Sequence, residues 1–253
     1  MKAVFLCAGY GTRLYPLTEK KPKALLSVAG ETLLTHLLRK IECVRSIKQI
    51  VIVTNDRFYP DFCAWKDKVV TSRMVSVIND GTKDPESRLG AIQDLKLAWE
   101  DDGLRGDVLA LAGDNLFDSE LVPFVSFAES KKPAPSVGVF DVGDLGMAKK
   151  YGLIQANSSG KITAFLEKPE RPPTTLASMG IYYFPKGTLR DINRYLSTNR
   201  NPDAPGYFIA WLSKEKEVFA FPFAGTWFDI GDFHSYEKAD QFFQMRREKQ
   251  GKH

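Results

Sequence analysis

Short, mostly apolar runs alternate with segments of helical periodicity in the first half of this chain. The runs share a length of four or five residues and occur at Val4–Cys7, Ile50–Val53, Val75–Ile78, Val108–Leu111 and Ser136–Phe140. Apolar residues recur on one helical face from about Thr32 to Val44, and a second helix is expected over Leu89–Trp99. Strands that are apolar throughout are typical of sheets covered by helices on both faces. The alternation therefore predicts an α/β fold with a Rossmann-like, open, mixed but mostly parallel sheet and helices on both faces.

The pattern changes after Ala148. Two apolar runs, Leu153–Ala156 and Ile162–Leu166, flank a polar Asn-Ser-Ser-Gly segment at 157–160, which is typical of a hairpin. Further strands are expected at Met179–Phe184 and Val218–Phe223, before a last helix that begins near Asp232 and faces inward with Phe233, Tyr236, Ala239 and Phe243. Because nothing resembling a linker divides the chain, we expect one domain of residues 1–253, with an α/β half of about 1–148 and a smaller antiparallel half of about 149–253.

Composition excludes several classes of protein. The chain is 43% hydrophobic and 26% charged, values that rule out a mainly disordered, collagen-like or coiled-coil chain. The net charge of +4 is spread along the chain, which fits phosphate handling better than nucleic-acid binding. Three cysteines without a C-x-x-C pattern predict neither a disulfide framework nor a thiolate metal site. Since the sequence shows neither a membrane-length apolar run nor a signal peptide, we expect no membrane association and a cytoplasmic location.

A glycine-rich loop follows the first predicted strand. The segment contains Ala8, Gly9, Gly11, Thr12 and Arg13 and is followed by three lysines, Lys20, Lys21 and Lys23. Glycines let backbone amides approach a phosphate, and an arginine with a lysine nearby makes a plausible triphosphate cradle. The alternative is a solvated connecting loop with ordinary surface lysines. A dinucleotide-binding dehydrogenase is disfavoured, since Leu14 replaces the third glycine of the fingerprint and prolines 16 and 22 interrupt any helix.

Two aspartates are candidate ligands of a hard cation. Asp114 follows the fourth apolar run, at the strand end where open α/β sheets bind ligands. Asp229 lies between Trp227 and Gly231. Carboxylates suit Mg²⁺, which keeps phosphate and water in its remaining positions. Sequence spacing alone does not show that the two side chains meet. Two alternative interpretations therefore stay open: Asp114 as a turn-forming residue and Asp229 as a surface charge. Trp227 and His234 are interpreted as structural residues.

A Glu167-Lys168-Pro169 segment in the second half is a further candidate site. The Lys168 ammonium could hold a phosphate and Glu167 a hydroxyl group, while Gly152 could let a ligand approach the backbone. An exposed turn at a strand end is the alternative interpretation.

Together these motifs resemble the signature of the sugar-1-phosphate nucleotidylyltransferases. The resemblance rests on Gly9-x-Gly11-Thr12-Arg13-Leu14-x-Pro16-Leu17-Thr18, the Lys21–Leu26 segment, Gly113-Asp114-Asn115, Tyr151-Gly152, Phe165-x-Glu167-Lys168-Pro169, Gly180-Ile181-Tyr182 and Trp227-x-Asp229-x-Gly231, all in family order. It implies a Mg²⁺-dependent enzyme that joins an NTP and a sugar 1-phosphate into an NDP-sugar and pyrophosphate. The first half would bind the nucleotide and the second half the acceptor.

The resemblance also implies roles for individual residues. Arg13 and Lys23 would be catalytic and bind the triphosphate, Asp114 and Asp229 would hold Mg²⁺, and four residues would bind the acceptor: Gly152, Glu167, Lys168 and Gly180. Nucleotide contacts are expected at Ala8, Gly9, Gly11, Thr12, Arg13, Lys23, Asn79, Gly81 and Gly90.

The segment around Asn79–Gly90 departs from the family pattern, because the usual glutamine is missing and the loop is longer. Base and acceptor identity are therefore open. A cytidylyltransferase acting on a non-sugar phosphate or phosphonate is the alternative enzyme, and a non-catalytic nucleotide-binding regulator is the alternative class. A homo-oligomer is compatible with the sequence.

Overall fold

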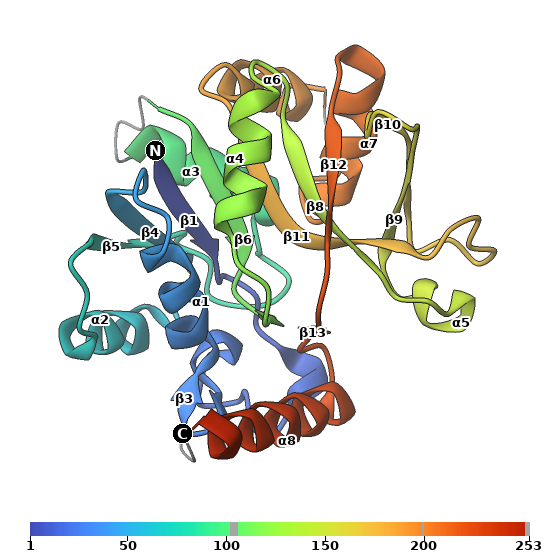
Figure 1. The fold of residues 1–253 in the computed structure, drawn as a ribbon. Helices are drawn as coiled ribbons and strands as arrows, with labels where there is room; N and C mark the ends of the chain where they lie inside the picture. The colour runs from blue at the N-terminus through green and yellow to red at the C-terminus, as the bar shows by residue number, and fades with distance from the viewer. Residues whose placement is uncertain (102–105, 199, 251–253) are drawn as a thin grey trace.

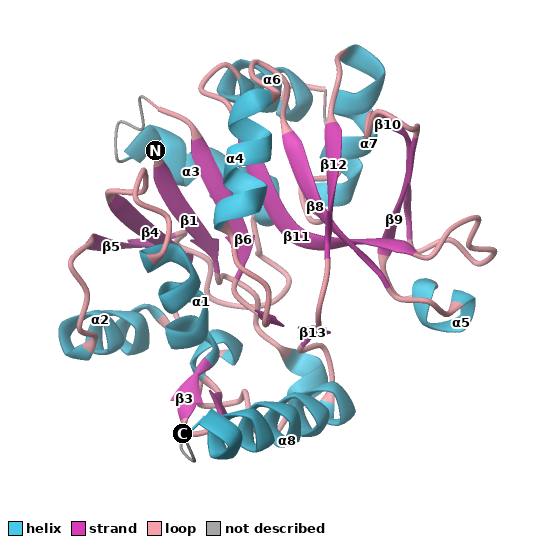
Figure 2. Cartoon of the chain, viewed as in Figure 1, coloured by secondary structure: helices cyan, strands magenta, loops and turns pink. Residues whose placement is uncertain are grey.

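The computed structural model describes residues 1–101, 106–198 and 200–250, and its main sheet has nine strands within these residues (Figures 1 and 2). Their bounds are β1 (Lys2–Leu6), β4 (Gln49–Thr54), β5 (Met74–Asn79), β6 (Val108–Ala112), β8 (Ser136–Asp141), β9 (Gly152–Ala156), β10 (Ile162–Glu167), β11 (Leu176–Phe184) and β12 (Phe219–Phe223). The order is β10-β9-β11-β6-β1-β4-β5, and β8 pairs with both β11 and β12. The predicted open, mixed sheet is confirmed.

Strand β11 joins two kinds of pairing in this sheet. On one side, β6, β1, β4 and β5 run parallel to one another. Strand β11 itself is antiparallel to β6, β8 and β9, and β9 forms the predicted antiparallel hairpin with β10. Strand β12 from the second half pairs parallel with β8 from the first half, so both halves of the chain contribute to both kinds of pairing.

Helices cover both faces of the sheet, and their buried side chains form two apolar clusters with its strands. Three of them, α1 (Leu33–Glu42), α2 (Tyr59–Lys68) and α4 (Val122–Ser130), share one apolar cluster with β1, β4 and β6. Three others, α3 (Ala91–Asp101), α6 (Thr188–Leu196) and α7 (Pro205–Glu215), share a second cluster on the opposite face. The predicted helix near Thr32–Val44 begins one residue later, since the Thr32 hydroxyl caps it by accepting from the Thr35 amide at 3.1 Å.

Seven further short elements occur among the described residues. Strand β7 (Asn115–Phe117) pairs antiparallel with β13 (Trp227–Asp229), and β2 (Ser27–Val28) pairs with β3 (Glu31–Thr32). The other three are helical: α5 (Leu145–Ala148) and the single turns η1 (Thr12–Leu14) and η2 (Lys23–Leu25). The expected strands and helices agree with the structure within about two residues, except that β11 begins at Leu176, three residues before the expected Met179. The helices α2, α4, α5, α6 and α7 and the short strands β2, β3, β7 and β13 were not predicted.

The last helix, α8 (Phe233–Gln250), lies across the N-terminal loops rather than on the main sheet (Figure 1). Its Ala239 is fully buried, and Tyr236 and Phe243 pack beside it against Leu14, Val28 and Leu33. The prediction that Phe233 faces inward is wrong. Phe233 is 39% exposed, because the first turn of α8 borders a hollow instead of the apolar cluster.

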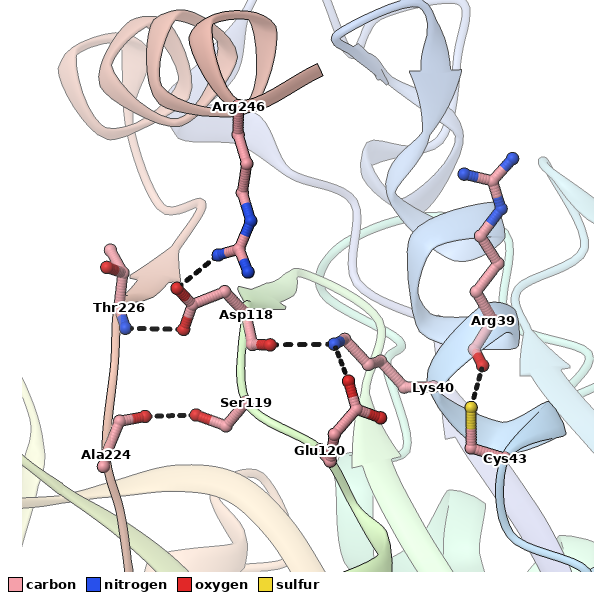
Figure 3. Close-up of polar contacts among 9 residues, drawn as sticks. All are labelled: Arg39, Lys40, Cys43, Asp118, Ser119, Glu120, Ala224, Thr226 and Arg246. Carbon is pink, nitrogen blue, oxygen red and sulfur yellow. Dashed lines mark hydrogen bonds and ion pairs between the residues drawn. The ribbon is translucent and has the colours of Figure 1, made fainter. Parts of the chain in front are cut away.

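A polar network fixes α8 to the rest of the fold (Figure 3). The Asp118 carboxylate, in the segment after β7, forms an ion pair with Arg246 of α8 and accepts from the Thr226 amide at 2.7 Å. The Asp118 carbonyl accepts from Lys40 of α1 at 2.9 Å, and that lysine also contacts Glu120 at 3.0 Å. One aspartate thus connects α1, β13 and α8.

No helix among the described residues is long and apolar enough to cross a membrane.

Candidate active site

The glycine-rich loop after β1 is held from two sides by buried side chains. Gly11 has φ +64°, a left-handed conformation that favours glycine, and its carbonyl accepts from the Thr18 hydroxyl at 2.7 Å. The Asn55 side-chain amide donates to the Ala8 carbonyl at 2.9 Å and accepts from the Phe58 amide. Thr18 and Asn55 are both fully buried. The loop conformation is therefore set by the fold itself.

Thr18→Val should destabilise the protein by about 0.5–1.5 kcal/mol, because it conserves side-chain volume but removes one of two hydrogen bonds to the Gly11 carbonyl, which also accepts from the Leu14 amide at 2.9 Å. Urea unfolding followed by circular dichroism measures the change. The matched control is Thr163→Val, whose hydroxyl donates to a carbonyl on the exposed hairpin and whose loss should change stability by less than about 0.5 kcal/mol. Equal effects of the two substitutions would contradict a special role for Thr18.

A hollow of about 280 Å³ opens over this loop. It is lined by the loop residues Gly9, Tyr10, Gly11, Thr12 and Arg13 together with Lys23, Asp114, Pro85, Arg88 and Asp203. The Lys23 ammonium is 2.5 Å from the Asp114 carboxylate, and both side chains are largely buried. Backbone glycines, a guanidinium and an ammonium therefore share one surface, as expected for a phosphate site.

The two predicted metal aspartates converge through a strand pair. Asp114 lies in the turn between β6 and β7, and Asp229 ends β13 opposite Asn115 in the β7–β13 ladder. The Ile230 amide donates to the Asp114 carbonyl at 3.0 Å, which closes the gap between the segments. Burial, and next the negative charge of Asp114, raise the pKa of Asp229 to about 6. Two residues far apart in sequence thus form one carboxylate pair.

The donor set of this pair fits Mg²⁺. Among the described residues, no group of three or more histidine, cysteine, aspartate or glutamate side chains could enclose a metal. Mg²⁺ requires no such enclosure, since one or two carboxylates with substrate phosphate and water satisfy it. A divalent cation would also relieve the repulsion that raises the pKa of Asp229. Asp114 and Asp229 are therefore the residues that could hold it.

A second hollow, of about 660 Å³, lies in the antiparallel half and contains all four predicted acceptor residues: Gly152, Glu167, Lys168 and Gly180. The Glu167 carboxylate lies against the backbone of Gly152 and Gly206. A Cβ atom on Gly152 would be 2.9 Å from the Glu167 Oε2 atom, and one on Gly206 would overlap it. Glycines at these two positions leave room for the carboxylate, and burial raises its pKa. Lys168, with its side chain 57% exposed, faces the same hollow.

Trp227 lines this hollow and is half-buried, so its interpretation as a core residue is only partly right. Its ring contacts Phe140 and Tyr151, with centroids 5.8 and 5.0 Å apart. Its indole N–H donates to the Asn115 side-chain oxygen at 2.8 Å. A Cβ atom on Gly180 would lie 2.9 Å from the same Asn115 amide. Trp227 and Gly180 thus fix Asn115 beside Asp114.

Four predicted nucleotide residues do not line either hollow in the described parts of the chain: Ala8, Asn79, Gly81 and Gly90. The Asn79 side chain donates to Asp56 at 2.7 Å and accepts from the Gly81 amide, so its amide is already used within the protein. A Cβ atom on Gly90 would lie 2.7 Å from the Pro202 carbonyl. Gly90 therefore allows close packing of α3 on the 202–203 segment.

Sequence reasoning missed several lining residues. Arg88 and Asp203 face the smaller hollow and pair at 3.0 Å, although 115 positions separate them. Lys150, His234, Ser235 and Lys238 surround the larger one, which corrects the structural interpretation of His234. Tertiary packing brings Arg88 and Asp203 together, so no local pattern identifies them as a pair.

The two hollows meet at Arg13, Asp114 and Gly231, which line both. A Cβ atom on Gly231 would lie 3.8 Å from Asp229 Oδ2 and 3.9 Å from Arg13 Nη1. One guanidinium and two carboxylates therefore occupy the junction. This arrangement can bring a phosphate from each hollow to a common charged centre.

The chain is similar in sequence and in fold to several known proteins. The family described as nucleotidyl transferase matches residues 2–246. The chain is 28% identical over 251 residues to a UTP–glucose-1-phosphate uridylyltransferase of Haloferax volcanii, covering 96% of this chain and 97% of the relative. It is 28% identical over 257 residues to a glucose-1-phosphate adenylyltransferase of Thermosipho africanus, covering 92% of this chain but only 59% of the relative. A solved UDP-glucose pyrophosphorylase in complex with UDP-glucose has the same fold, with a TM-score of 0.81 at 21% identity, covering 97% of this chain and 98% of that one.

Proposed function

This chain belongs to the nucleotidyl transferase family, and we propose that it joins an NTP to a sugar 1-phosphate, giving an NDP-sugar and pyrophosphate. The names of the relatives, a glucose-1-phosphate uridylyltransferase and a glucose-1-phosphate adenylyltransferase, support a sugar 1-phosphate as the acceptor. Since these names differ in the nucleobase, they leave the base of this enzyme open. The cytoplasmic location and a homo-oligomer stay predictions.

One observation carries the proposal: the two hollows share Arg13, Asp114 and Gly231. A triphosphate over the glycine-rich loop and an acceptor phosphate near Lys168 would meet at this junction. Holding two reactants in reach of each other converts a bimolecular step into an effectively unimolecular one.

In the proposed reaction, an acceptor phosphate oxygen attacks the α-phosphorus of the NTP in line. A new oxygen–phosphorus bond forms while the bond from the α-phosphorus to the bridging oxygen breaks, and pyrophosphate leaves with that bond's electron pair. The acceptor phosphate is already ionised at neutral pH, so the step needs no general base. The enzyme contributes orientation and charge neutralisation.

Each residue has a defined part in this scheme. Arg13 and Lys23 neutralise the triphosphate, and Lys168 holds the acceptor phosphate by charge while Glu167 accepts from a sugar hydroxyl. Asp114 and Asp229 are the residues that would hold Mg²⁺. When bound, Mg²⁺ would supply positive charge to the phosphate oxygens and so favour the developing charge of the transition state.

A pyrophosphate-release matrix tests the proposal. Four NTPs and dTTP are each combined with several sugar 1-phosphates and, as controls, with sugar 6-phosphates, a non-sugar phosphate and a phosphonate. Release confined to sugar 1-phosphates supports the proposal. Release with CTP and only the phosphonate or non-sugar acceptor would establish the cytidylyltransferase alternative, which the relatives do not favour. Absence of release in every combination would indicate a nucleotide-binding regulator.

Lys168→Ala tests whether the second half of the chain binds the acceptor while the first half binds the nucleotide. The substitution removes a charge-assisted hydrogen bond to the acceptor phosphate, worth about 1.5–3 kcal/mol, so the acceptor KM should rise about 10- to 150-fold. Calorimetry with NTP and Mg²⁺ but no acceptor should give an unchanged Kd. The control is Lys161→Ala, on the exposed hairpin beside Glu217, which should alter neither constant. Loss of NTP binding with an unchanged acceptor KM would instead assign Lys168 to the nucleotide.

A further inference from the structure

The larger hollow extends beyond the residues assigned to the acceptor. Its volume is about 660 Å³, against about 280 Å³ for the hollow over the glycine-rich loop, although a nucleoside triphosphate is larger than a sugar 1-phosphate. The assigned residues Gly152, Glu167, Lys168 and Gly180 come from β9, β10, β11 and the turn after β10. Residues of α8 and of the segment after α5 line a further part of the hollow. The hollow can therefore hold an acceptor that is larger than a simple sugar 1-phosphate.

One face of the first two turns of α8 lines this further part. His234, Ser235 and Lys238 all border the hollow, and His234 and Lys238 are four residues apart, the spacing of neighbours on one helical face. In Figure 1, α8 lies below β13, whereas β9 and β10 lie above it. The side chains of α8 therefore reach the hollow from a different side than Glu167 of β10.

Three basic side chains gather on this side of the hollow: Lys150, His234 and Lys238. Among residues 1–101, 106–198 and 200–250, none of the three has a side-chain hydrogen bond or an ion pair. Asp232, the acidic residue on the same side, accepts from the Ser235 amide at 2.8 Å. Hydrogen bonds from Ser235, followed by the charges of Lys150 and His234, lower the pKa of Asp232. One carboxylate that already caps α8 thus faces three basic groups, which leaves an excess of positive charge.

The reacting phosphate does not account for these three groups. In the proposed scheme it lies near Lys168 and reaches the junction of the hollows at Arg13 and Asp114, where Mg²⁺ adds further positive charge. The hydroxyl groups of a sugar carry no charge, so they would leave the ammonium groups on the α8 side without a counter-ion. A cleft lined by an excess of one charge attracts ligands of the opposite charge.

We propose that the acceptor is a sugar 1-phosphate that carries a second anionic group, a carboxylate or a second phosphate, and that Lys150, His234 and Lys238 bind that group. This inference rests on the proposed function for the transfer reaction and names the class of its acceptor. Lysine binds both anions as a point charge, so carboxylate and phosphate share this chemistry and the test distinguishes them.

Pyrophosphate release with matched acceptors tests the proposal, using the NTP that gives the highest rate. Each set contains a hexose 1-phosphate, the corresponding uronic acid 1-phosphate and the hexose 1,6-bisphosphate, in the gluco, galacto and manno configurations. In the preferred configuration, kcat/KM for an anionic acceptor should exceed that for the neutral sugar about 10-fold or more. The preferred anionic acceptor identifies the second group as a carboxylate or a phosphate. Raising NaCl from about 0.05 M to about 0.5 M should reduce this preference, because salt screens exposed charges.

Lys238→Met should lower the ratio of the two kcat/KM values about 10-fold, because it keeps the apolar stem of the side chain and removes its charge. Lys238→Arg keeps the charge and should retain the preference. The matched control is Lys249→Met, an exposed lysine near the other end of α8 that does not line the hollow, and it should leave the ratio unchanged.

Two results would overturn the proposal: equal kcat/KM of the wild-type protein for neutral and anionic acceptors in every configuration, or a preference that survives both Lys238→Met and Lys150→Met. The wild-type comparison requires no variant, so it decides the question even if a variant fails to fold.

Failure of this inference is distinguishable from failure of the proposed function. Release from neutral sugar 1-phosphates without any preference would overturn the inference and leave the transfer activity intact. Calorimetric titration with the same acceptors supplies a readout that does not depend on turnover. Tighter binding of the anionic acceptors, lost in Lys238→Met, with no release from any acceptor would refute the transfer activity and support the anion site. Absence of both release and preferential binding would overturn both.

Discussion

Asp114→Asn is expected to lower kcat/KM about 10³-fold, or about 4 kcal/mol of transition-state stabilisation, in saturating Mg²⁺. The substitution removes one of the two carboxylates at the junction of the hollows. The same carboxylate is the ion-pair partner of the Lys23 ammonium, at a distance of 2.5 Å. Steady-state pyrophosphate release measures the loss, and far-UV circular dichroism should be unchanged because Asp114 is a turn residue outside the apolar clusters.

The control for this prediction is Asp67→Asn, on the exposed surface of α2 with its side chain 72% accessible. It should leave both activity and unfolding midpoint as in the wild type. Full activity of Asp114→Asn in Mg²⁺ would refute the assignment of the carboxylate pair to the metal.

Lys23→Ala is expected to lower kcat/KM about 10²- to 10³-fold in both directions of the reaction. The same ammonium would contact the triphosphate going forward and pyrophosphate in reverse, and one preorganised charge contact is worth about this much. The measurement pairs pyrophosphate release with NTP formation from NDP-sugar and pyrophosphate.

Lys20→Ala, three residues earlier on an exposed part of the same loop, controls for general loss of positive charge and should change either rate less than about 2-fold. A Lys23→Ala enzyme slowed in only one direction would show that the lysine contacts a single reactant rather than the shared phosphates.

Prediction from sequence succeeded where a local pattern determines structure. Apolar runs identified the buried strands β1, β4 and β6, because a buried strand must be apolar on both faces, and the less buried β5 by its valines and isoleucine. Sequence prediction missed α4 and α7, whose first turns contain Pro123 and Pro205 and whose aromatic residues give no clear helical stripe. Phe233 continues the apolar stripe of α8 in the sequence, yet its side chain is exposed. Its burial depends on which residues surround the first turn of the helix, and the sequence pattern does not show them.

The candidate site shows the same difference between residues that lie in local motifs and residues that only tertiary packing brings together. The glycine-rich loop, Lys23 and Asp114 lie in short motifs, so their residue types and spacing indicated phosphate chemistry. Arg88 and Asp203 gave no such signal, since they lie 115 positions apart and pair at 3.0 Å only in the folded chain.

The C-terminal helix has a consequence for how the protein matures during synthesis. Three hydrogen bonds link α8 to the segment that follows Lys23. The Asp240 carboxylate accepts from the Ala29 amide, and Arg247 donates to the Ala29 carbonyl. Tyr236 donates to the Ser27 carbonyl. Asp229, just before α8, completes the carboxylate pair. A chain leaving the ribosome can assemble β1, β4 and β6 early, but the Ser27–Ala29 segment gains these hydrogen bonds only after residues 236–247 have emerged. The carboxylate pair likewise forms only after Asp229 has emerged, so the site is assembled well after the parallel strands.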